Sequence, residues 1–393
     1  MHQNFKILIV IIMLSSLHIF NVDAQQIEQE ELVQYTKTSN FIKEFKIPLD
    51  TLGLKGITTD SQGNAWFYHA TNVTSTIIKF EPETGIFTTF SIEDQTQSND
   101  PIINLAGGMI MYDKSRDLIW FTDARTNSIV NIDIQSGKVQ LVSIPMKDSG
   151  PMGIALSPDE KSIWFSEIIA NKIAKLDVQT GTITEYSTGE QSGPTFLTFD
   201  NNGELWITLS YSHEILHVKP KLLDSDLTLV EYEIPSRPAD GSIVYPLGIS
   251  VDSQNNVWFS EWNVNKIGII DGNKPIPFDI IVNSTKITIP SNSNENPTLI
   301  EITVLKEDDS PLNVNETNTI FLKTSSTMDP SLGLVNITAT FTNEMIFLNE
   351  TTKSESVQLL INSNFPPSGN YTLAISATNG EVTKSVFLDL IIE

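Results

Sequence analysis

The sequence contains no cysteine and comparatively few basic residues, and both features limit what the protein can do. Without cysteine there can be no disulfide framework, thiolate zinc site or thiol nucleophile. The 393 residues carry 48 acidic and 24 basic side chains, which gives a net charge of −24. Because nucleic-acid binding needs a basic surface that neutralises phosphates, this balance excludes a nucleic-acid partner. An apolar content of 40% indicates a folded chain, and its length suggests two or three domains.

The first 24 residues have the pattern of a secretory signal peptide. Lys6 precedes an apolar run from Ile7 to Phe20 that two serines interrupt, and Val22-Asp23-Ala24 resembles a cleavage site. An uncleaved anchor is the alternative, but the run is shorter than the ~20 apolar residues that cross a bilayer. No later segment has the length and apolarity of a span. We therefore expect a secreted or extracytoplasmic monomer, with residues 25–40 as an N-terminal extension and no membrane span in the mature chain.

Acceptor motifs for N-glycosylation are concentrated in the second half of the chain. Six Asn-x-Ser/Thr motifs occur, at Asn72, Asn283, Asn315, Asn336, Asn349 and Asn370. They would make a glycoprotein only if the host glycosylates its exported proteins, and chance occurrence in an Asn- and Thr-rich chain is the alternative.

Residues 41–279 repeat one pattern five times. Its clearest mark is a tryptophan followed by Phe or Ile, at Trp66, Trp120, Trp164, Trp206 and Trp258. Within each unit, short alternating apolar runs are separated by Gly, Pro, Asn and Asp, which is typical of the four antiparallel strands of a β-propeller blade. The pattern predicts an all-β chain with a five-bladed propeller. A sixth, degenerate blade within 91–106 or 220–245 is the alternative.

A segment ahead of the first unit resembles the fourth strands of later units. Residues 43–48 read Lys-Glu-Phe-Lys-Ile-Pro, and residues 231–235 read Glu-Tyr-Glu-Ile-Pro. Because this segment precedes the first unit, we expect it to supply the missing outer strand of the last blade. It would then close the ring and cover an exposed sheet edge.

Two units resemble the blades of a known family. Trp164-Phe165-Ser166-Glu167 is followed by Asn171-Lys172-Ile173-Ala174, and Trp258-Phe259-Ser260-Glu261 by Asn265-Lys266-Ile267-Gly268. Both stretches look like blades of the virginiamycin B lyase, or streptogramin lyase, family. The chain is also similar, more weakly, to gluconolactonase-like and NHL-type propellers. The resemblance implies a propeller that performs a magnesium-dependent elimination, opening an ester ring in a cyclic peptide antibiotic with acidic metal ligands and a histidine base.

The histidine that the resemblance implies is missing. In the family it lies between Pro and Gly of a Pro-His-Gly-Ile turn, and the corresponding positions here hold Lys55, Gly107, Met152, Thr195 and Leu247. The resemblance therefore supports the fold more strongly than the activity.

Antiparallel strands place two positions of every repeat at the same end of its blade, which we call the loop end. They are the start of the first strand and the residue three after each tryptophan, which is His69, Asp123, Glu167, Leu209 or Glu261. Three acids could hold Mg²⁺ or Ca²⁺, which prefer oxygen ligands. His69 and Lys55 are the candidate bases for an elimination.

Further residues at the loop end are candidates for ligand binding. Arg125, Tyr211 and Asn263 follow two residues beyond the acid position, and Trp262 could stack on a sugar or an aromatic group. The alternative is structural: the acids would accept hydrogen bonds from neighbouring backbone, and the repeated tryptophans would be core wedges between blades. His213 and His217 are interpreted as third-strand residues.

The composition changes near residue 280, where tryptophan disappears and Asn, Ser and Thr become frequent. We expect a linker over 280–298 and an immunoglobulin-like β-sandwich over 299–393, because alternating runs there predict six or seven strands. The sequence leaves two functional hypotheses. In one, a secreted propeller recognises a small molecule, peptide or glycan through its loop end, with the sandwich as a spacer. In the other, the chain is a metal-dependent lyase or ring-opening hydrolase.

Overall fold

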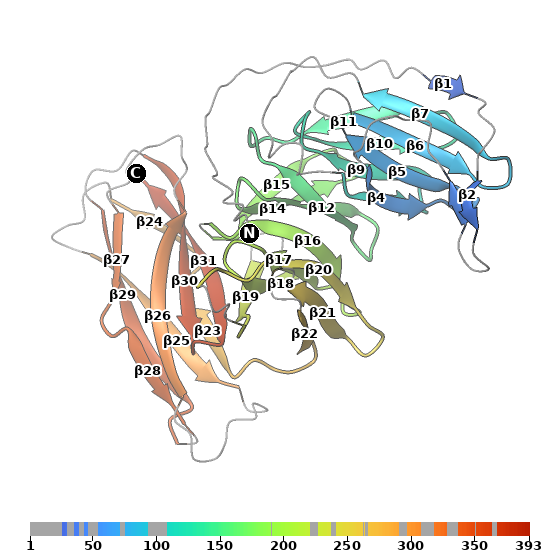
Figure 1. Ribbon diagram of the computed structural model, residues 1–393. Helices are drawn as coiled ribbons and strands as arrows, with labels where there is room; N and C mark the ends of the chain where they lie inside the picture. The colour runs from blue at the N-terminus through green and yellow to red at the C-terminus, as the bar shows by residue number, and fades with distance from the viewer. Residues whose placement is uncertain are drawn as a thin grey trace, which may run out of the picture. The chain divides into compact units, whose positions relative to one another are not determined.

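The computed structural model describes residues 26–29, 35–38, 43–45, 54–70, 75–92, 108–189, 191–220, 227–236, 241–261, 263, 266–290, 297–307, 318–327, 337–349, 351–363 and 368–393. All regular elements in these ranges are strands, so the predicted all-β class is confirmed (Figure 1). Within the same ranges no helix has the length and apolarity that crossing a bilayer requires. The predicted signal peptide lies outside the described residues.

The chain divides into two compact units, Met1–Ser149 and Gly150–Glu393. Unit 1 contains two blades. Blade 1 is formed by β4 (Leu54–Thr59), β5 (Ala65–Ala70), β6 (Ser75–Glu81) and β7 (Ile86–Ile92), and blade 2 by β8 (Ile110–Asp113), β9 (Leu118–Asp123), β10 (Ser128–Asp133) and β11 (Val139–Ser143). The N-terminal extension contributes β1 (Gln26–Gln29), which adds a fifth strand to blade 1 beside β7.

Unit 2 contains three further blades. Blade 3 consists of β12 (Pro151–Leu156), β13 (Ser162–Glu167), β14 (Lys172–Asp177) and β15 (Ile183–Ser187). Blade 4 consists of β16 (Pro194–Phe199), β17 (Leu205–Leu209), β18 (Glu214–Pro220) and β19 (Leu227–Glu233). Blade 5 consists of β20 (Pro246–Val251), β21 (Asn256–Glu261) and β22 (Lys266–Asp271). The described residues therefore contain the five blades that the tryptophan repeat predicts.

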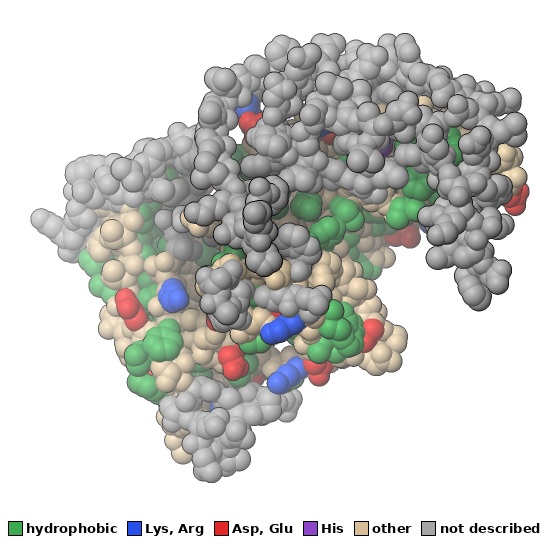
Figure 2. Space-filling view, in the orientation of Figure 1, with side chains coloured by type: hydrophobic (Ala, Val, Ile, Leu, Met, Phe, Trp, Pro, Cys, Tyr) green, Lys and Arg blue, Asp and Glu red, His purple; other side chains and the backbone are tan. Residues whose placement is uncertain are grey.

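Blade 5 differs from the expectation because it has only three strands among the described residues. The segment expected to complete it forms β3 (Lys43–Phe45), which pairs with the nearby β2 (Tyr35–Thr38) in a two-stranded sheet. A partner only a few residues away in sequence costs little entropy to reach, which explains this local pairing. Hydrophobic side chains of blade 5 reach the surface, with Trp258 39% and Ile267 73% exposed (Figure 2).

A turn that precedes the tryptophan organises blades 1, 4 and 5. In each of them an aspartate six residues before the tryptophan accepts a hydrogen bond from the indole Nε1, at 2.8 Å for Asp60 and Trp66 and 3.1 Å for Asp200 and Trp206. The same carboxylates also accept hydrogen bonds from backbone amides of the turn. Trp66 and Trp206 are fully buried. In blades 1 and 4 the tryptophan is therefore part of the core, as the structural interpretation predicts, whereas Trp258 of blade 5 keeps the hydrogen bond but is partly exposed.

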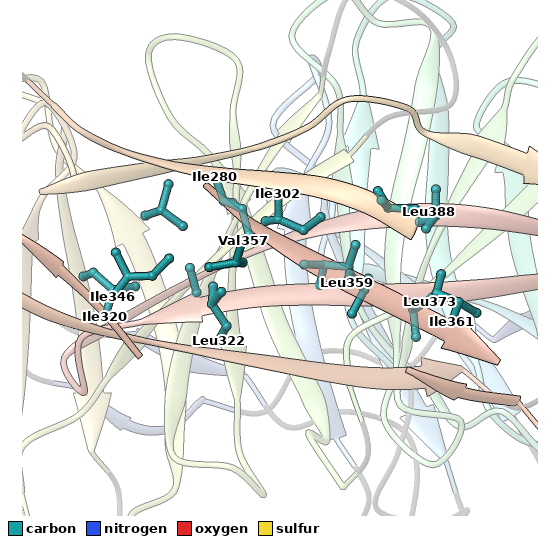
Figure 3. Packing of buried hydrophobic residues seen from close by; sticks show 14 of the residues in the cluster. Ile280, Ile302, Ile320, Leu322, Ile346, Val357, Leu359, Ile361, Leu373 and Leu388 are labelled. Atoms are coloured by element: carbon teal, nitrogen blue, oxygen red, sulfur yellow. The ribbon is translucent and has the colours of Figure 1, made fainter. Parts of the chain in front are cut away.

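The C-terminal part of unit 2 is a two-layer β-sandwich. One sheet contains β28 (Met345–Leu348), β26 (Asn318–Thr327), β30 (Gly369–Thr378) and β31 (Val382–Ile392), and the other β23 (Phe278–Val282), β25 (Thr298–Lys306), β29 (Ser354–Ser363) and β27 (Ile337–Phe341). Aliphatic side chains from both sheets interdigitate between the layers, as Figure 3 shows around Ile302, Val357 and Leu388. The immunoglobulin-like assignment of this sandwich stays a prediction.

The expected linker over 280–298 is instead largely part of the sandwich. β23 pairs with β25, and β24 (Lys286–Ile289) pairs in parallel with β31. Ile280 and Ile289 are buried in the sandwich core. The apolar side chains of these short strands hold them in the sheets, although the surrounding polar residues resemble those of a linker.

Blade 4 and the sandwich share one continuous sheet. The outer strand of the blade, β19, pairs antiparallel with β31, and Tyr232 lies opposite Val382. Phe387 of β31 packs against the apolar cluster that blades 3 and 4 form around Trp164 and Leu229. The sandwich therefore covers the edge of the blade that would otherwise present unpaired backbone groups.

Candidate functional site

The strand registers confirm that the two expected positions meet at the loop end. Pro151 pairs with Glu167, and Pro246 pairs with Glu261. In blades 1, 3, 4 and 5 the first strand shifts register just after this point, in the manner of a β-bulge. A bulge re-aims side chains, and it falls where the resemblance implies the histidine of a Pro-His-Gly turn. Here the bulged positions of blades 3 to 5 carry Met152, Thr195 and Leu247.

Hydroxyl groups at the loop end connect neighbouring blades within unit 2. Ser166 Oγ accepts a hydrogen bond from Gly153 N at 2.8 Å and donates one to Thr195 O of the next blade. Thr208 repeats this pattern, since its Oγ1 accepts from Phe196 N at 3.1 Å and donates to Leu247 O at 3.0 Å. These hydrogen bonds fix the inner strands of blades 3, 4 and 5 against one another.

We predict that Ser166→Ala lowers the free energy of unfolding by about 1–3 kcal/mol, because the buried Gly153 N–H and Thr195 carbonyl both lose their partner. Ser260→Ala is the matched control. Ser260 occupies the same position of blade 5, but its Oγ accepts from Gly248 N in an exposed setting, so water can replace it. Urea unfolding of both variants measures the difference, and equal losses would contradict the role assigned to Ser166.

Asparagines tie the loop after the second strand to the connection that leads into the next blade. Asn127 and Asn171 both adopt a left-handed backbone, with φ of 49° and 54°. The Asn127 side-chain oxygen accepts from Ser149 N at 3.0 Å, and that of Asn171 accepts from Gly193 N at 3.0 Å. Each of these asparagines follows its tryptophan by seven residues. This spacing has a structural cause, because Asn tolerates the left-handed conformation better than most residues.

Asp123 is a buried carboxylate with a full set of hydrogen bonds. Its Oδ1 accepts from Arg125 N at 3.1 Å, Ser75 Oγ at 3.2 Å and Tyr68 Oη at 3.3 Å, and its Oδ2 accepts from Thr126 Oγ1 at 3.1 Å. Burial raises the pKa of Asp123 despite these bonds. Because Ser75 and Tyr68 belong to blade 1, the carboxylate holds blades 1 and 2 together. This geometry matches the structural alternative for the acid position.

Glu167 presents the opposite case. Its side chain is 0% exposed, and within the described part of the chain neither carboxyl oxygen has a hydrogen-bond partner. Burial, together with the neighbouring charge of Glu185, raises the pKa of Glu167 to about 8, although Lys172 opposes the shift. At neutral pH this carboxyl is therefore mostly neutral and can donate a hydrogen bond. In Glu261, which is also buried, the Oε2 atom has no partner among the described residues.

The two candidate bases lie on blade 1. His69 is nearly fully buried on β5, where it lies opposite Leu54 of β4. Lys55 belongs to β4, but its side chain lies outside the described part of the structure. The predicted site residues are divided between the two units. Unit 1 contains Lys55, His69, Asp123 and Arg125, and unit 2 contains Glu167, Tyr211, Glu261, Trp262 and Asn263.

The candidate ligand-binding residues have different surroundings. Arg125 is buried in blade 2. Asn263 holds the connection into blade 5, since its Oδ1 accepts from Tyr245 N at 2.9 Å and its Nδ2 donates to Ile243 O at 2.6 Å. Tyr211 packs its ring directly on Gly193, and its backbone N–H donates to Ser192 O at 3.0 Å. Trp262 lies outside the described residues.

Two features of the site were not predicted from the sequence. Tyr245, at the start of blade 5, lies near Tyr211, and together with burial it raises the pKa of the Tyr211 phenol. At the opposite end of blade 4, which we call the turn end, the side chains of Asp200, Glu204 and His217 converge. The sequence holds one signal for this cluster: two residues before the tryptophan, blade 4 has Glu204 where blades 1 and 5 have asparagine.

Comparison with known proteins identifies the family. The model of the virginiamycin B lyase family matches residues 40–283, which is more than half of the chain and includes all five blades. The chain belongs to the virginiamycin B lyase family. No curated protein matches this member of the virginiamycin B lyase family.

Solved structures with similarity to this virginiamycin B lyase family member include two lyases. A streptogramin B lyase structure is 22% identical over 67% of this chain and 83% of its own, with a TM-score of 0.45. The virginiamycin B lyase from Staphylococcus aureus is 18% identical over 94% of this chain and 100% of its own, also at 0.45. A protein from Lactobacillus plantarum is 13% identical over 73% of this chain and 93% of its own, at 0.44.

Proposed function

We propose that this virginiamycin B lyase family member is an extracytoplasmic recognition protein that binds a small molecule, peptide or glycan at the loop end of its blades. The observation that carries the proposal is the pair of tyrosines, Tyr211 and Tyr245, at the loop end of blades 4 and 5. Each backbone is held by a hydrogen bond, from Tyr211 N to Ser192 O and from Tyr245 N to Asn263 Oδ1. Both side chains are half-buried. Rigid tyrosines offer a large apolar contact area with a polar tip, which suits recognition of sugars and peptides.

A lyase activity is less well supported by the same residues. At the bulge, Thr195 is almost fully buried, and its hydroxyl lies 2.8 Å from Thr208 Oγ1 and 2.9 Å from Ser210 Oγ. Neither a hydroxyl in such a cluster nor the side chains of Met152 and Leu247 can act as a general base near neutral pH.

A divalent cation remains part of the proposal as an aid to binding. Of the three acids expected to hold Mg²⁺ or Ca²⁺, Asp123 has its oxygens occupied by four donors, so it fits a cation poorly. Among the described residues, both carboxyl oxygens of Glu167 and the Oε2 atom of Glu261 have no hydrogen-bond partner, so these two acids fit better. Glu167 would have to lose its proton to act as a ligand, because its pKa is about 8.

Glycan and peptide arrays probed with the full chain test the proposal. The wild type should bind a defined set of array compounds, and Tyr211→Ala and Tyr245→Ala should weaken that binding at least ~10-fold, as expected for loss of an aromatic anchor. Tyr112→Ala is the control, since this tyrosine lies at the turn end of blade 2, where its phenol donates to Asp117 at 2.7 Å. Unchanged binding by both loop-end variants would contradict the proposal.

Mass spectrometry of a cyclic ester antibiotic incubated with the chain and Mg²⁺ distinguishes the alternative. Elimination opens the ring without changing the mass, so it is detected by chromatography and fragmentation, whereas hydrolysis adds one water. Catalytic ring opening in either form would overturn the assignment as a recognition protein. N-terminal sequencing of the exported chain tests the predicted cleavage after residue 24.

A further inference from the structure

Blade 4 departs from blades 1 and 5 at a turn that the three blades otherwise share. In blades 1 and 5 an asparagine lies two residues before the tryptophan, and its side-chain amide donates to the turn aspartate, from Asn64 to Asp60 and from Asn256 to Asp252, both at 2.9 Å. Blade 4 has Glu204 at this position. A carboxylate cannot donate this hydrogen bond, so blade 4 places a second acid where the other two blades have an amide donor.

A histidine completes the difference. His217 lies directly opposite Trp206 across β17 and β18, a register position that holds Lys79, Asn131, Lys175 and Ile269 in the other blades. The imidazole stacks on the Trp206 indole, with ring centroids 3.8 Å apart and planes at 11°. Its Nε2 lies 2.8 Å from Glu204 Oε2. The stacking fixes the ring orientation, as a ligating imidazole requires.

The imidazole is also 98% buried, because only 2% of the residue is exposed, and its Nδ1 has no partner among the described residues. Buried polar atoms normally have a hydrogen-bond partner, so the hydrogen bond to Glu204 does not by itself explain why this ring is buried with its Nδ1 atom unpaired among the described residues.

The three side chains lie close together. One potential ligand atom from each of Asp200, Glu204 and His217 lies within 4.8 Å of the other two. We propose that Asp200, Glu204 and His217 bind one divalent transition-metal ion of the zinc class at the turn end of blade 4. An imidazole with two carboxylates suits Zn²⁺ better than Ca²⁺ or Mg²⁺, which prefer all-oxygen sites, and two negative charges match a dication.

The neighbouring groups are compatible with this assignment. Asp200 Oδ1 is held by the backbone amides of Asn202 and Glu204, both at 2.9 Å, which leaves Oδ2 as the ligand atom. Oδ2 accepts a hydrogen bond from Trp206 Nε1 at 3.1 Å and a long one from Asn255 Nδ2 at 3.4 Å, and the ion would replace the longer of the two. Lys219 Nζ lies 3.7 Å from Glu204 Oε2 and its side chain is 41% exposed, so it can move into solvent when the ion supplies the positive charge.

The bound ion would act as a staple. It would tie the turn between β16 and β17 to β18, and among the described residues no other blade has such a cluster of ligands. Because the site lies at the turn end, ion binding should stabilise the fold without changing the ligand specificity of the loop end.

Calorimetric titration of the full chain with ZnCl₂, after dialysis against a chelator, tests the site. The wild type should bind one Zn²⁺ per chain more tightly than Ca²⁺ or Mg²⁺ and should unfold at a higher temperature with the ion. Glu204→Asn restores the asparagine of blades 1 and 5, so it should fold normally and bind Zn²⁺ at least ~10-fold more weakly. His217→Gln should have the same effect on binding.

His213→Asn is the matched control. His213 is the other histidine of blade 4, has a left-handed φ of 52°, and occupies the repeat position of Asn127 and Asn171. This variant should bind Zn²⁺ as the wild type does. The proposal is overturned if the wild type binds no Zn²⁺, or if Glu204→Asn retains the wild-type affinity. A loss of binding in His213→Asn with unchanged binding in Glu204→Asn would place the ion elsewhere and would also overturn it.

Discussion

Replacement of Trp206 by alanine should lower the free energy of unfolding by about 3–5 kcal/mol, the cost of removing a large buried aromatic side chain. Trp206 is 0% exposed. Its indole stacks with His217 and Tyr232, at centroid distances of 3.8 Å and 5.6 Å, and donates to Asp200 at 3.1 Å. The substitution therefore removes packing, two ring contacts and a buried hydrogen bond in a single step.

Trp258→Ala is the comparison that separates packing from repeat position. Trp258 occupies the same place in blade 5 and makes the same bond, to Asp252 at 3.0 Å, but its side chain is 39% exposed. We expect it to cost less than about 2 kcal/mol, because much less apolar area is lost. Scanning calorimetry of the full chain resolves the two variants. Equal losses would show that the turn, rather than burial, stabilises the blades.

The second large effect is a dependence of stability on pH through Glu167. Burial raises the pKa of this carboxyl from 4.5 to about 8, so between these values the unfolded chain holds fewer protons than the folded one. The stabilisation is complete below pH 4.5 and is lost as the pH rises through 8. The full shift corresponds to about 5 kcal/mol. Glu167→Gln removes this titration and should flatten the stability profile over that range.

Unfolding free energies measured by urea titration from pH 5 to pH 9 test this expectation. Glu231, whose pKa burial and the nearby Glu214 raise to about 8, adds a slope of the same sign. The informative quantity is therefore the difference between the wild type and Glu167→Gln at each pH. Glu301→Gln, an exposed position on β25, should follow the wild-type profile. Parallel profiles for wild type and Glu167→Gln would show that Glu167 is ionised in the folded protein.

The blades were predictable from the sequence because every blade repeats the same local contacts. The tryptophan, the following acid position and the asparagine seven residues later all depend on contacts within one unit of the repeat or with the next, so one template identifies them. The turn of Asp60, Asp200 and Asp252 belongs to the same template. The family resemblance depends on the same residues, and the family match over residues 40–283 confirms it.

Features that depend on partners far apart in sequence were not predictable. No local pattern shows that Asp123 receives bonds from Tyr68 and Ser75, 55 and 48 residues earlier. The assignment of residues 280–298 as a linker was wrong for its two strands, because the polar residues between them outnumber the few side chains that enter the core. The pairing of β19 with β31 has no sequence signal, since sheet edges are joined by backbone groups that every residue carries.

The shared sheet of blade 4 and the sandwich also affects the order in which the chain can fold. Tyr232 of β19 finds its partner Val382 only 150 residues later. During synthesis, blades 1 to 3 can assemble from neighbouring segments, but the outer edge of β19 stays unpaired until β31 has been synthesised. Contacts this distant form slowly, and an open strand edge favours aggregation in the interval. Pairing of β31 with β19 is therefore the last step in completing blade 4, which begins more than a hundred residues before β31.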